Sequence, residues 1–181
     1  MLTRADLDAL DALDLTRALT LWEPWASAVV AGPKDIENRT WAPPERFRER
    51  LIWIHSGSKF DLQRADQVFE LWPEGRERFA ADMGEELGLA MPARPVMRIV
   101  GCARIAGVID DDDDNAAALL DDTHPDGDTT QWYMGPVGWV MTDRIALKTP
   151  GPVRRGLQGL WVLTDEERAH HLELLRETLA G

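Results

Sequence analysis

The chain has 181 residues, the length of one decorated domain, which is long enough to bury a hydrophobic core and short for two domains. Its formal net charge of −12 argues against a protein that coats nucleic acid without selection, because such binding requires cations that neutralise phosphates. The single cysteine, Cys102, excludes an internal disulfide, and with four scattered histidines it leaves too few ligands for a structural zinc site, so we expect no metal and no cofactor.

The N-terminal region shows no targeting signal. No stretch of eighteen apolar residues is present, and the first residues are acidic where a signal peptide would be basic and then apolar. We therefore expect a cytoplasmic protein with no membrane partner. Leu7, Leu10 and Leu13 recur at helical spacing, which predicts an N-terminal helical extension over residues 1–17.

The next segment predicts a strand, a helix and a second strand. The apolar run from Ala18 to Trp22 favours a short strand, and Pro24 suits the first turn of a helix that ends before Gly32. A period of two after this stop would place three side chains on one face of an extended segment, namely Glu37, Arg39 and Trp41.

Residues 51–55 alternate in a β-branched and aromatic run, which predicts a central strand. Ser58 and Asp61 have the spacing of a capping box, so we expect a helix from there through Trp72, the first part of a helical insertion over residues 60–95.

The C-terminal half predicts three strands and a helix. Residues 96–110 form a long β-branched run with a possible bulge at Gly101, and an acidic loop follows over residues 110–131. Strands at residues 137–147 and just before Thr164 precede a C-terminal helix over residues 164–181 that Thr164 caps. Five or six short strands with flanking helices predict an α+β fold built on a small mixed β-barrel.

Charge is spread unevenly along the chain. Residues 34–59 carry six basic and four acidic side chains, and residues 144–161 carry four basic and no acidic ones. Two basic islands could focus an anionic ligand onto one cleft, although acidic residues that collect on solvated helices and loops would produce the same pattern.

Lys34 is the strongest candidate for a functional residue. The chain has three lysines against seventeen arginines, and one of those lysines directly follows the predicted helix stop. An amine on a flexible stem offers a point charge or a removable proton that a guanidinium does not. Lys59, near the start of the next predicted helix, is the second such position.

Several short motifs carry a resemblance to a known family. Its pattern reads aromatic-x-Pro-Trp-Ala, then Gly-x-Lys-x-x-Glu-x-Arg, then a strand that ends in His or Ala with small residues, then a strand Trp and a closing Gly-Leu-Trp. The matching positions here are Trp22, Pro24, Trp25, Ala26, Gly32, Lys34, Glu37, Arg39, His55, Ser56, Trp139, Gly159, Leu160 and Trp161. The chain thereby resembles the ASCH (activating signal cointegrator homology) domain, whose fold is similar to the PUA barrels. The similarity is close over residues 18–60 and loose over 97–163, which implies one barrel domain over 18–163.

The resemblance implies a cleft that binds RNA, single-stranded nucleic acid or a nucleotide, lined by the Gly-x-Lys-x-x-Glu-x-Arg residues. The residue types fit such a ligand, since indoles stack on base faces and cations hold phosphate. The alternative is a hydrolase for RNA or an acylated nucleoside, with Lys34 and Glu37 as catalytic residues. The relatives that deacylate cytidine carry a threonine where this chain has Glu37, so their nucleophile would be missing.

Each candidate ligand-binding residue also has a structural interpretation. Trp25 shares a helical face with apolar residues and could belong to the core, and Glu37 and Arg39 could form a structural ion pair. His55 could be a packed strand residue, and it makes no triad with Ser56 because strand neighbours point to opposite faces. Gln158 could form hydrogen bonds to the edge of a base, or it could form them within a turn of its own chain.

The remaining ligand candidates are Trp22, Trp41 and Lys59. A third function would be a protein interaction in which the acidic run Asp110–Asp114 docks a basic partner, which the sequence does not identify.

Overall fold

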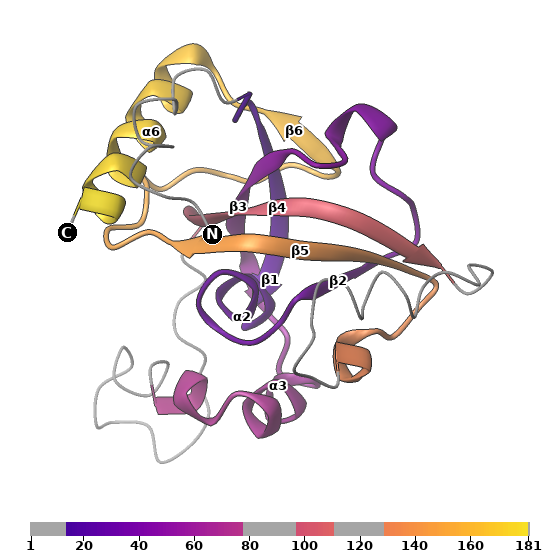
Figure 1. Ribbon diagram of the computed structural model, residues 1–181. Helices are drawn as coiled ribbons and strands as arrows, with labels where there is room; N and C mark the ends of the chain where they lie inside the picture. The colour runs from indigo at the N-terminus through magenta and orange to yellow at the C-terminus, as the bar shows by residue number, and fades with distance from the viewer. Residues whose placement is uncertain (1–13, 78–96, 111–128, 181) are drawn as a thin grey trace.

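The computed structural model describes residues 14–77, 97–110 and 129–180 (Figure 1). In chain order the elements are β1 Arg17–Glu23, α2 Trp25–Ala31, β2 Ile36–Arg39, the 3-10 turn η2 Glu45–Phe47, β3 Leu51–Phe60, α3 Ala65–Leu71, β4 Arg98–Asp110, the 3-10 turn η3 Thr129–Trp132, β5 Val137–Ala146, β6 Leu160–Val162 and α6 Asp165–Ala180. The predicted N-terminal helix, the second half of the predicted insertion and most of the acidic loop lie outside the described residues.

The described strands form one mixed sheet in the order β2-β5-β4-β3-β1-β6. β1 runs parallel to β3, and the other neighbouring pairs are antiparallel. The α+β class is confirmed. The sheet is open, because its two edge strands β2 and β6 do not pair with each other, so closure into a barrel stays a prediction.

Strand β3 is central and buried on both faces. Leu51 and Trp53 pack in one apolar cluster with residues of α6, whereas Ile52 and Ile54 pack in another with residues of α2. The near-continuous apolar run of β3 follows from this double coverage, since a strand with one wet face would alternate with polar residues. The prediction of a central strand here is confirmed, and helices α2 and α6 lie on opposite faces of the sheet (Figure 1).

Helix α2 is short and sits against the sheet. Four of its seven residues are buried, Ala26, Ala28, Val29 and Val30. It ends at Gly32, whose N–H donates to the Ala28 carbonyl at 3.1 Å and whose missing Cβ leaves room for the Trp72 ring, which an added methyl would approach to 2.8 Å. The helix predicted from Pro24 to the Gly32 stop is confirmed to within a residue.

The predicted capping box at Ser58 is wrong. Ser58 belongs to β3, which continues to Phe60 because that residue still pairs with Glu23 of β1. Helix α3 begins later, at Ala65, and the Asp61 carboxylate accepts the Arg64 N–H at 3.3 Å in the turn before it. The spacing of Ser58 and Asp61 favours an earlier helix start. It does not reveal that β3 continues to Phe60, because the cross-strand partner of Phe60 lies far back in the chain.

Two other local predictions agree with the structure. The register between β3 and β4 shifts beside Gly101, where the predicted bulge lies. Thr164 caps α6 through a reciprocal pair: its Oγ1 accepts the Glu167 N–H at 3.2 Å, and the Glu167 carboxylate accepts the Thr164 N–H at 2.8 Å.

Two buried histidines hold segment 151–156 against the sheet and α6. His55 lies with Nε2 2.9 Å from the Arg154 carbonyl and its ring edge-on to Trp161, and His171 lies with Nδ1 2.6 Å from the Glu167 carbonyl. An added Cβ at Gly151 would lie 2.3 Å from His171 Nε2, so this glycine allows the segment to approach the ring. Burial is the largest influence on both rings and lowers their pKa values below the ordinary 6.5, and the Arg154 charge acts in the same direction.

The lowered pKa values predict a loss of stability in mild acid. As pH falls through about 6.5, the unfolded chain takes up protons on these histidines before the folded chain does, so the free energy of unfolding decreases. Stability should be full above that pH and fall below it, with a slope of up to about 1.4 kcal/mol per pH unit for each imidazole. Urea unfolding between pH 5 and 8 measures this slope. His171→Gln should reduce the slope by more than His170→Gln, because His170 is exposed and acts only through its charge, which lowers the pKa of His171. Equal slopes in the two variants would contradict the assignment.

Candidate functional site

A cleft of about 480 Å³ opens where the end of β1, the start of α2, the segment through β2 and the turn before β5 meet. Its lining residues are Thr20, Leu21, Trp22, Trp25, Lys34, Glu37, Asn38, Arg39, Thr40, Trp41, Asp61, Arg64, Met134, Gly135 and Pro136. Six of the predicted site residues therefore meet in one concavity: Trp22, Trp25, Lys34, Glu37, Arg39 and Trp41.

Lys34 is held in place by its own loop. Its backbone N–H donates to the Ala28 carbonyl at 3.2 Å, and the Arg144 guanidinium donates to the carbonyls of Gly32 and Lys34, each at 2.9 Å. Burial lowers the pKa of Arg144, an effect that the Asp35 charge opposes. Because the backbone on both sides of Lys34 is anchored, the side chain starts from a fixed point at the base of the cleft.

The Lys34 side chain is 2 % exposed and its ammonium has two hydrogen-bond acceptors. Its Nζ donates to the Ile36 carbonyl and to Glu37 Oε2, the latter at 2.8 Å, and lies 5.6 Å from the centre of the Trp25 ring. A buried ammonium needs such partners, because an unpaired charge out of water is costly. In the structure, Lys34 is therefore a hydrogen-bond donor to two neighbouring oxygen atoms.

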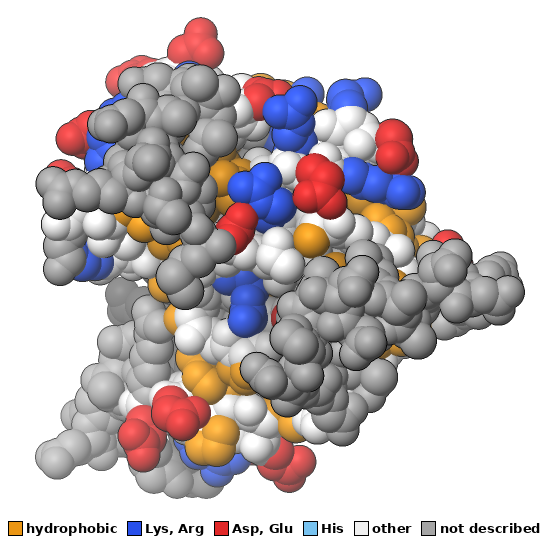
Figure 2. All heavy atoms as spheres, in the orientation of Figure 1, with side chains coloured by type: hydrophobic (Ala, Val, Ile, Leu, Met, Phe, Trp, Pro, Cys, Tyr) orange, Lys and Arg blue, Asp and Glu red, His pale blue; other side chains and the backbone are white. Residues whose placement is uncertain are grey.

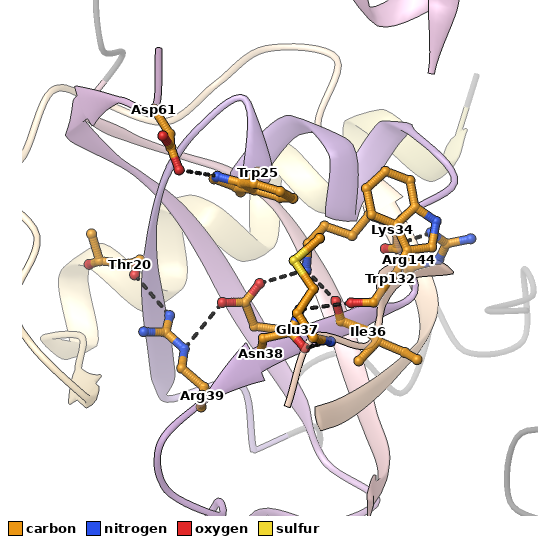
Figure 3. A network of polar contacts seen from close by, with 11 residues as sticks. Thr20, Trp25, Lys34, Ile36, Glu37, Asn38, Arg39, Asp61, Trp132 and Arg144 are labelled. Atoms are coloured by element: carbon orange, nitrogen blue, oxygen red, sulfur yellow. Dashed lines mark hydrogen bonds and ion pairs between the residues drawn. The ribbon is translucent and has the colours of Figure 1, made fainter. Parts of the chain in front are cut away.

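Glu37 joins Lys34 to Arg39. Its second carboxylate oxygen lies 3.2 Å from Arg39 Nε, and Arg39 Nη2 donates to the Thr20 carbonyl at 3.2 Å. Figure 3 shows Arg39, Glu37 and Lys34 in a row beneath the Trp25 ring. The structural ion pair weighed from the sequence is present, and the three side chains together carry one net positive charge.

The hydrogen bond from Arg39 to the Thr20 carbonyl spans the open side of the sheet. Arg39 belongs to edge strand β2, and Thr20 belongs to β1 just beyond the last residue that pairs with β6, Leu19. A guanidinium therefore connects two strands that no backbone pairing joins, and the cleft lies at this junction.

Two indoles of the cleft are oriented by contacts behind them. Trp25 donates from Nε1 to Asp61 Oδ2 at 3.0 Å and stands edge-on to Trp132. Trp41 stands edge-on to buried Trp139 at a centroid distance of 4.8 Å, and Trp139 Nε1 donates to the Trp41 carbonyl at 3.0 Å. Both rings are half-buried, so Trp25 serves the core and the cleft at once.

Asn38 holds one side of the cleft in place, a role that the sequence did not indicate. Its Nδ2 donates to the Trp132 carbonyl at 2.8 Å, and its Oδ1 accepts the Met134 N–H at 2.7 Å. These bonds hold the turn of Met134 to Pro136 at the side of the cleft, although it lies almost a hundred residues along the chain. No local motif marks such a pair, and Thr20, Asp61 and Arg64 were likewise absent from the predicted lining.

Four predicted ligand residues do not line the cleft: His55, Ser56, Lys59 and Gln158. His55 and Ser56 are buried in β3, where parallel register places them opposite Thr20 and Leu21. Lys59 is exposed near the mouth, with Nζ 4.8 Å from the centre of the Trp22 ring. Gln158 is exposed in the segment before β6.

Cys102, the single cysteine of the chain, lies buried in β4. Burial raises the pKa of the Cys102 thiol to about 12, so it is no nucleophile at neutral pH. Among residues 14–77, 97–110 and 129–180, no group of three or more His, Cys, Asp or Glu side chains is placed to hold a metal ion. No helix in the described part of the chain is long and apolar enough to cross a membrane.

The surface charges on the face seen in Figure 2 are mixed. Lys and Arg side chains lie among Asp and Glu side chains over its described part, and no broad region of one sign is visible. The lining of the cleft itself has three basic side chains, Lys34, Arg39 and Arg64, against two acidic ones, Glu37 and Asp61, so its local balance favours an anion.

Comparison with known proteins adds the family. A family model described as ASCH domain matches residues 19–134. Similar solved structures include the ASCH protein of Zymomonas mobilis, which is 18% identical and has a TM-score of 0.47; the match covers 87% of this chain and 94% of that chain. Two single-residue variants of that protein are also 18% identical, with TM-scores of 0.46. Their matches cover 87% of this chain and 94% or 96% of theirs. No curated protein matches the chain.

Proposed function

Because this chain belongs to the ASCH domain family, we propose that its cleft binds single-stranded RNA or a nucleotide. Family membership supports a general RNA-binding role. The observation that carries the narrower proposal is the convergence of an ammonium, a carboxylate, a guanidinium and three indoles on one cleft.

The size and apolar surface of the cleft suit one nucleotide. A volume of about 480 Å³ lies in the range of small-molecule sites, roughly 300–1,000 Å³, and far below what a duplex would need. Trp25 and Trp41 supply ring faces from two elements, and stacking on an aromatic ring does not depend on which base is bound. The contacts of both rings to Asp61, Trp132 and Trp139 orient them before a ligand arrives.

The polar groups suit an anion with a base attached. Arg39 is 23 % exposed and uses two of its three guanidinium nitrogens for Glu37 and Thr20, so its remaining donors can reach phosphate or a base carbonyl. Glu37 Oε2 accepts a hydrogen bond from Lys34 and Oε1 forms an ion pair with Arg39, and both oxygens keep a lone pair for an exocyclic amine.

The alternative is hydrolysis of RNA or of an acylated nucleoside. The contact of 2.8 Å between Lys34 Nζ and Glu37 Oε2 at the base of the cleft favours it. Lys34 donates two hydrogen bonds, so in this reaction it would stabilise developing negative charge while Glu37 acts as general acid or base. Thr20 and Thr40 line the cleft, and the Thr20 hydroxyl already accepts a hydrogen bond from Trp161 Nε1 at 2.9 Å, so Thr40 is the threonine to test as a nucleophile.

Lys34→Ala is expected to weaken binding of a single-stranded RNA tetranucleotide by roughly 10- to 100-fold, because a hydrogen bond to a charged group contributes about 1.5–3 kcal/mol. Isothermal titration at two salt concentrations measures this affinity. Lys148→Gln removes an exposed lysine whose backbone contacts α6, and it should leave the affinity unchanged. Thermal unfolding checks the fold, and Arg39→Gln, at a more exposed site, repeats the test if Lys34→Ala is unstable.

Two outcomes would reject these proposals. Absence of binding to every mononucleotide and oligonucleotide would reject the binding function, as would Lys34→Ala and Arg39→Gln proteins that fold and bind as tightly as the parent. Incubation with RNA or N4-acetylcytidine separates the alternative: turnover lost in Glu37→Gln supports catalysis, and no turnover at high protein concentration removes it.

A further inference from the structure

Trp22 differs from every other tryptophan of the chain. All eight lie in the described residues, and seven are buried or half-buried, whereas Trp22 is 49 % exposed. Its position in β1 explains the direction, because Leu21 and Glu23 on either side are buried and the side chain between them points the other way. The Trp22 ring lines the mouth of the cleft.

The exposed ring is held from behind by strand β3. The register between β1 and β3 shifts after Leu21, and the irregular stretch of β3 brings Gly57 and Lys59 next to Trp22. A Cβ added at Gly57 would lie 3.8 Å from Trp22 Cδ1, and Lys59 Nζ lies 4.8 Å from the ring centre. The indole is thus placed by its neighbours while nearly half of its surface faces solvent.

The cations near this ring are available for an anion. Within the described residues neither Lys59 nor Arg64 has an ion-pair partner. In a chain of net charge −12, one unpaired cation beside an exposed indole and a second in the cleft lining match the pattern of single-strand binding sites, where aromatic rings stack bases and cations follow the backbone.

We propose that Trp22 and Lys59 form a second nucleotide subsite at the mouth of the cleft, here called the rim subsite. The inference rests on the proposed binding function and narrows it: the ligand is an oligonucleotide of at least two residues rather than a free nucleoside or mononucleotide. One nucleotide occupies the cleft, the next base stacks on Trp22, and Lys59 or Arg64 contacts the phosphate between them.

The test compares a nucleoside 3′-phosphate, the matching 5′-phosphate and the RNA dinucleotide that contains both. Both mononucleotides are used as their methyl phosphodiesters, so that every ligand carries a single phosphodiester charge. The dinucleotide then differs from either chiefly by one nucleoside, and its gain in affinity measures the rim subsite. We expect that gain to be about 5- to 100-fold, the range for stacking one base on an aromatic side chain. Trp22→Ala should remove most of the dinucleotide gain and lower the affinity for the dinucleotide by a larger factor than that for either mononucleotide, and Trp22→Phe should retain part of the gain.

Lys59 is tested by salt dependence. Lys59→Gln should lower the slope of log affinity against log salt for the dinucleotide by about 0.7, the value for one phosphate contact on a single strand. Lys148→Gln, the same change far from the cleft, should leave the slope unchanged. Equal affinities for the dinucleotide and both mononucleotides, or an equal loss for all three in Trp22→Ala, would overturn the rim subsite while leaving the cleft as a nucleotide site. Failure of every ligand to bind would instead overturn the proposed function and the rim subsite with it.

Discussion

Replacing Glu37 with alanine is expected to lower the free energy of unfolding by about 3–5 kcal/mol. The carboxylate is 7 % exposed and lies between Lys34 and Arg39, so its removal leaves a buried ammonium with only the Ile36 carbonyl and separates Arg39 from its ion partner. The loss reflects uncompensated charge out of water more than the attraction within the pair.

Urea unfolding measures this loss, and the exposed pair of Glu173 and Arg176 provides a matched control. That pair also has a short contact, 3.0 Å, but Glu173 is 62 % exposed, so Glu173→Ala should cost less than about 1 kcal/mol. Adding Lys34→Met to Glu37→Ala should restore part of the stability, because it removes the stranded charge. A Glu37→Ala protein as stable as Glu173→Ala would show that the buried row contributes little to folding.

Trp139→Ala is expected to cost about 3–5 kcal/mol of stability and also to weaken ligand binding. Trp139 is fully buried in β5, and its removal leaves a large cavity in the core. It also takes away the ring against which Trp41 stands and the N–H that fixes the Trp41 carbonyl. The indole at the cleft would lose its orientation, so the binding loss should exceed what reduced stability explains.

Trp53→Ala is the control that separates the loss of stability from the loss of ligand binding. Trp53 is also fully buried and donates from Nε1 to a backbone carbonyl, that of Leu15 at 3.0 Å, but it packs on the opposite face of the sheet with α6. It should lose a similar amount of stability and keep the affinity of the folded protein for RNA. Calorimetric titration well below each melting temperature compares the two variants; equal affinities would mean that Trp139 does not position Trp41.

Short-range structure was largely predictable from the sequence. The first strand, helix α2, central strand β3 and the Thr164 cap depend on neighbouring residues such as Pro24, Gly32 and the capping pair, which periodicity and turn chemistry reveal. The order of the strands and the end of β3 at Phe60 depend on partners far along the chain, and no local pattern encodes these.

The candidate site likewise has contacts that the sequence predicts and contacts that it does not. Glu37 and Arg39 lie two residues apart, so strand alternation predicts that they share a face, and the family motif adds Lys34 to them. The side of the cleft held by Asn38 and the orientation of Trp41 by Trp139 join segments almost a hundred residues apart, which one sequence does not disclose. His55 and Ser56 follow the family motif yet lie inside the sheet, because a residue can match a motif for reasons of packing.

The link from Arg39 to Thr20 has a consequence for how wide the entrance can become. Strands joined by backbone hydrogen bonds stay about 4.8 Å apart, whereas one long side chain can rotate about several bonds while its end stays attached. The β1 and β2 margins can therefore separate or approach without loss of any ladder in the sheet. We therefore expect the proposed nucleotide site to take both pyrimidine and purine nucleotides, with the difference in bulk met by rotation of the Arg39 side chain.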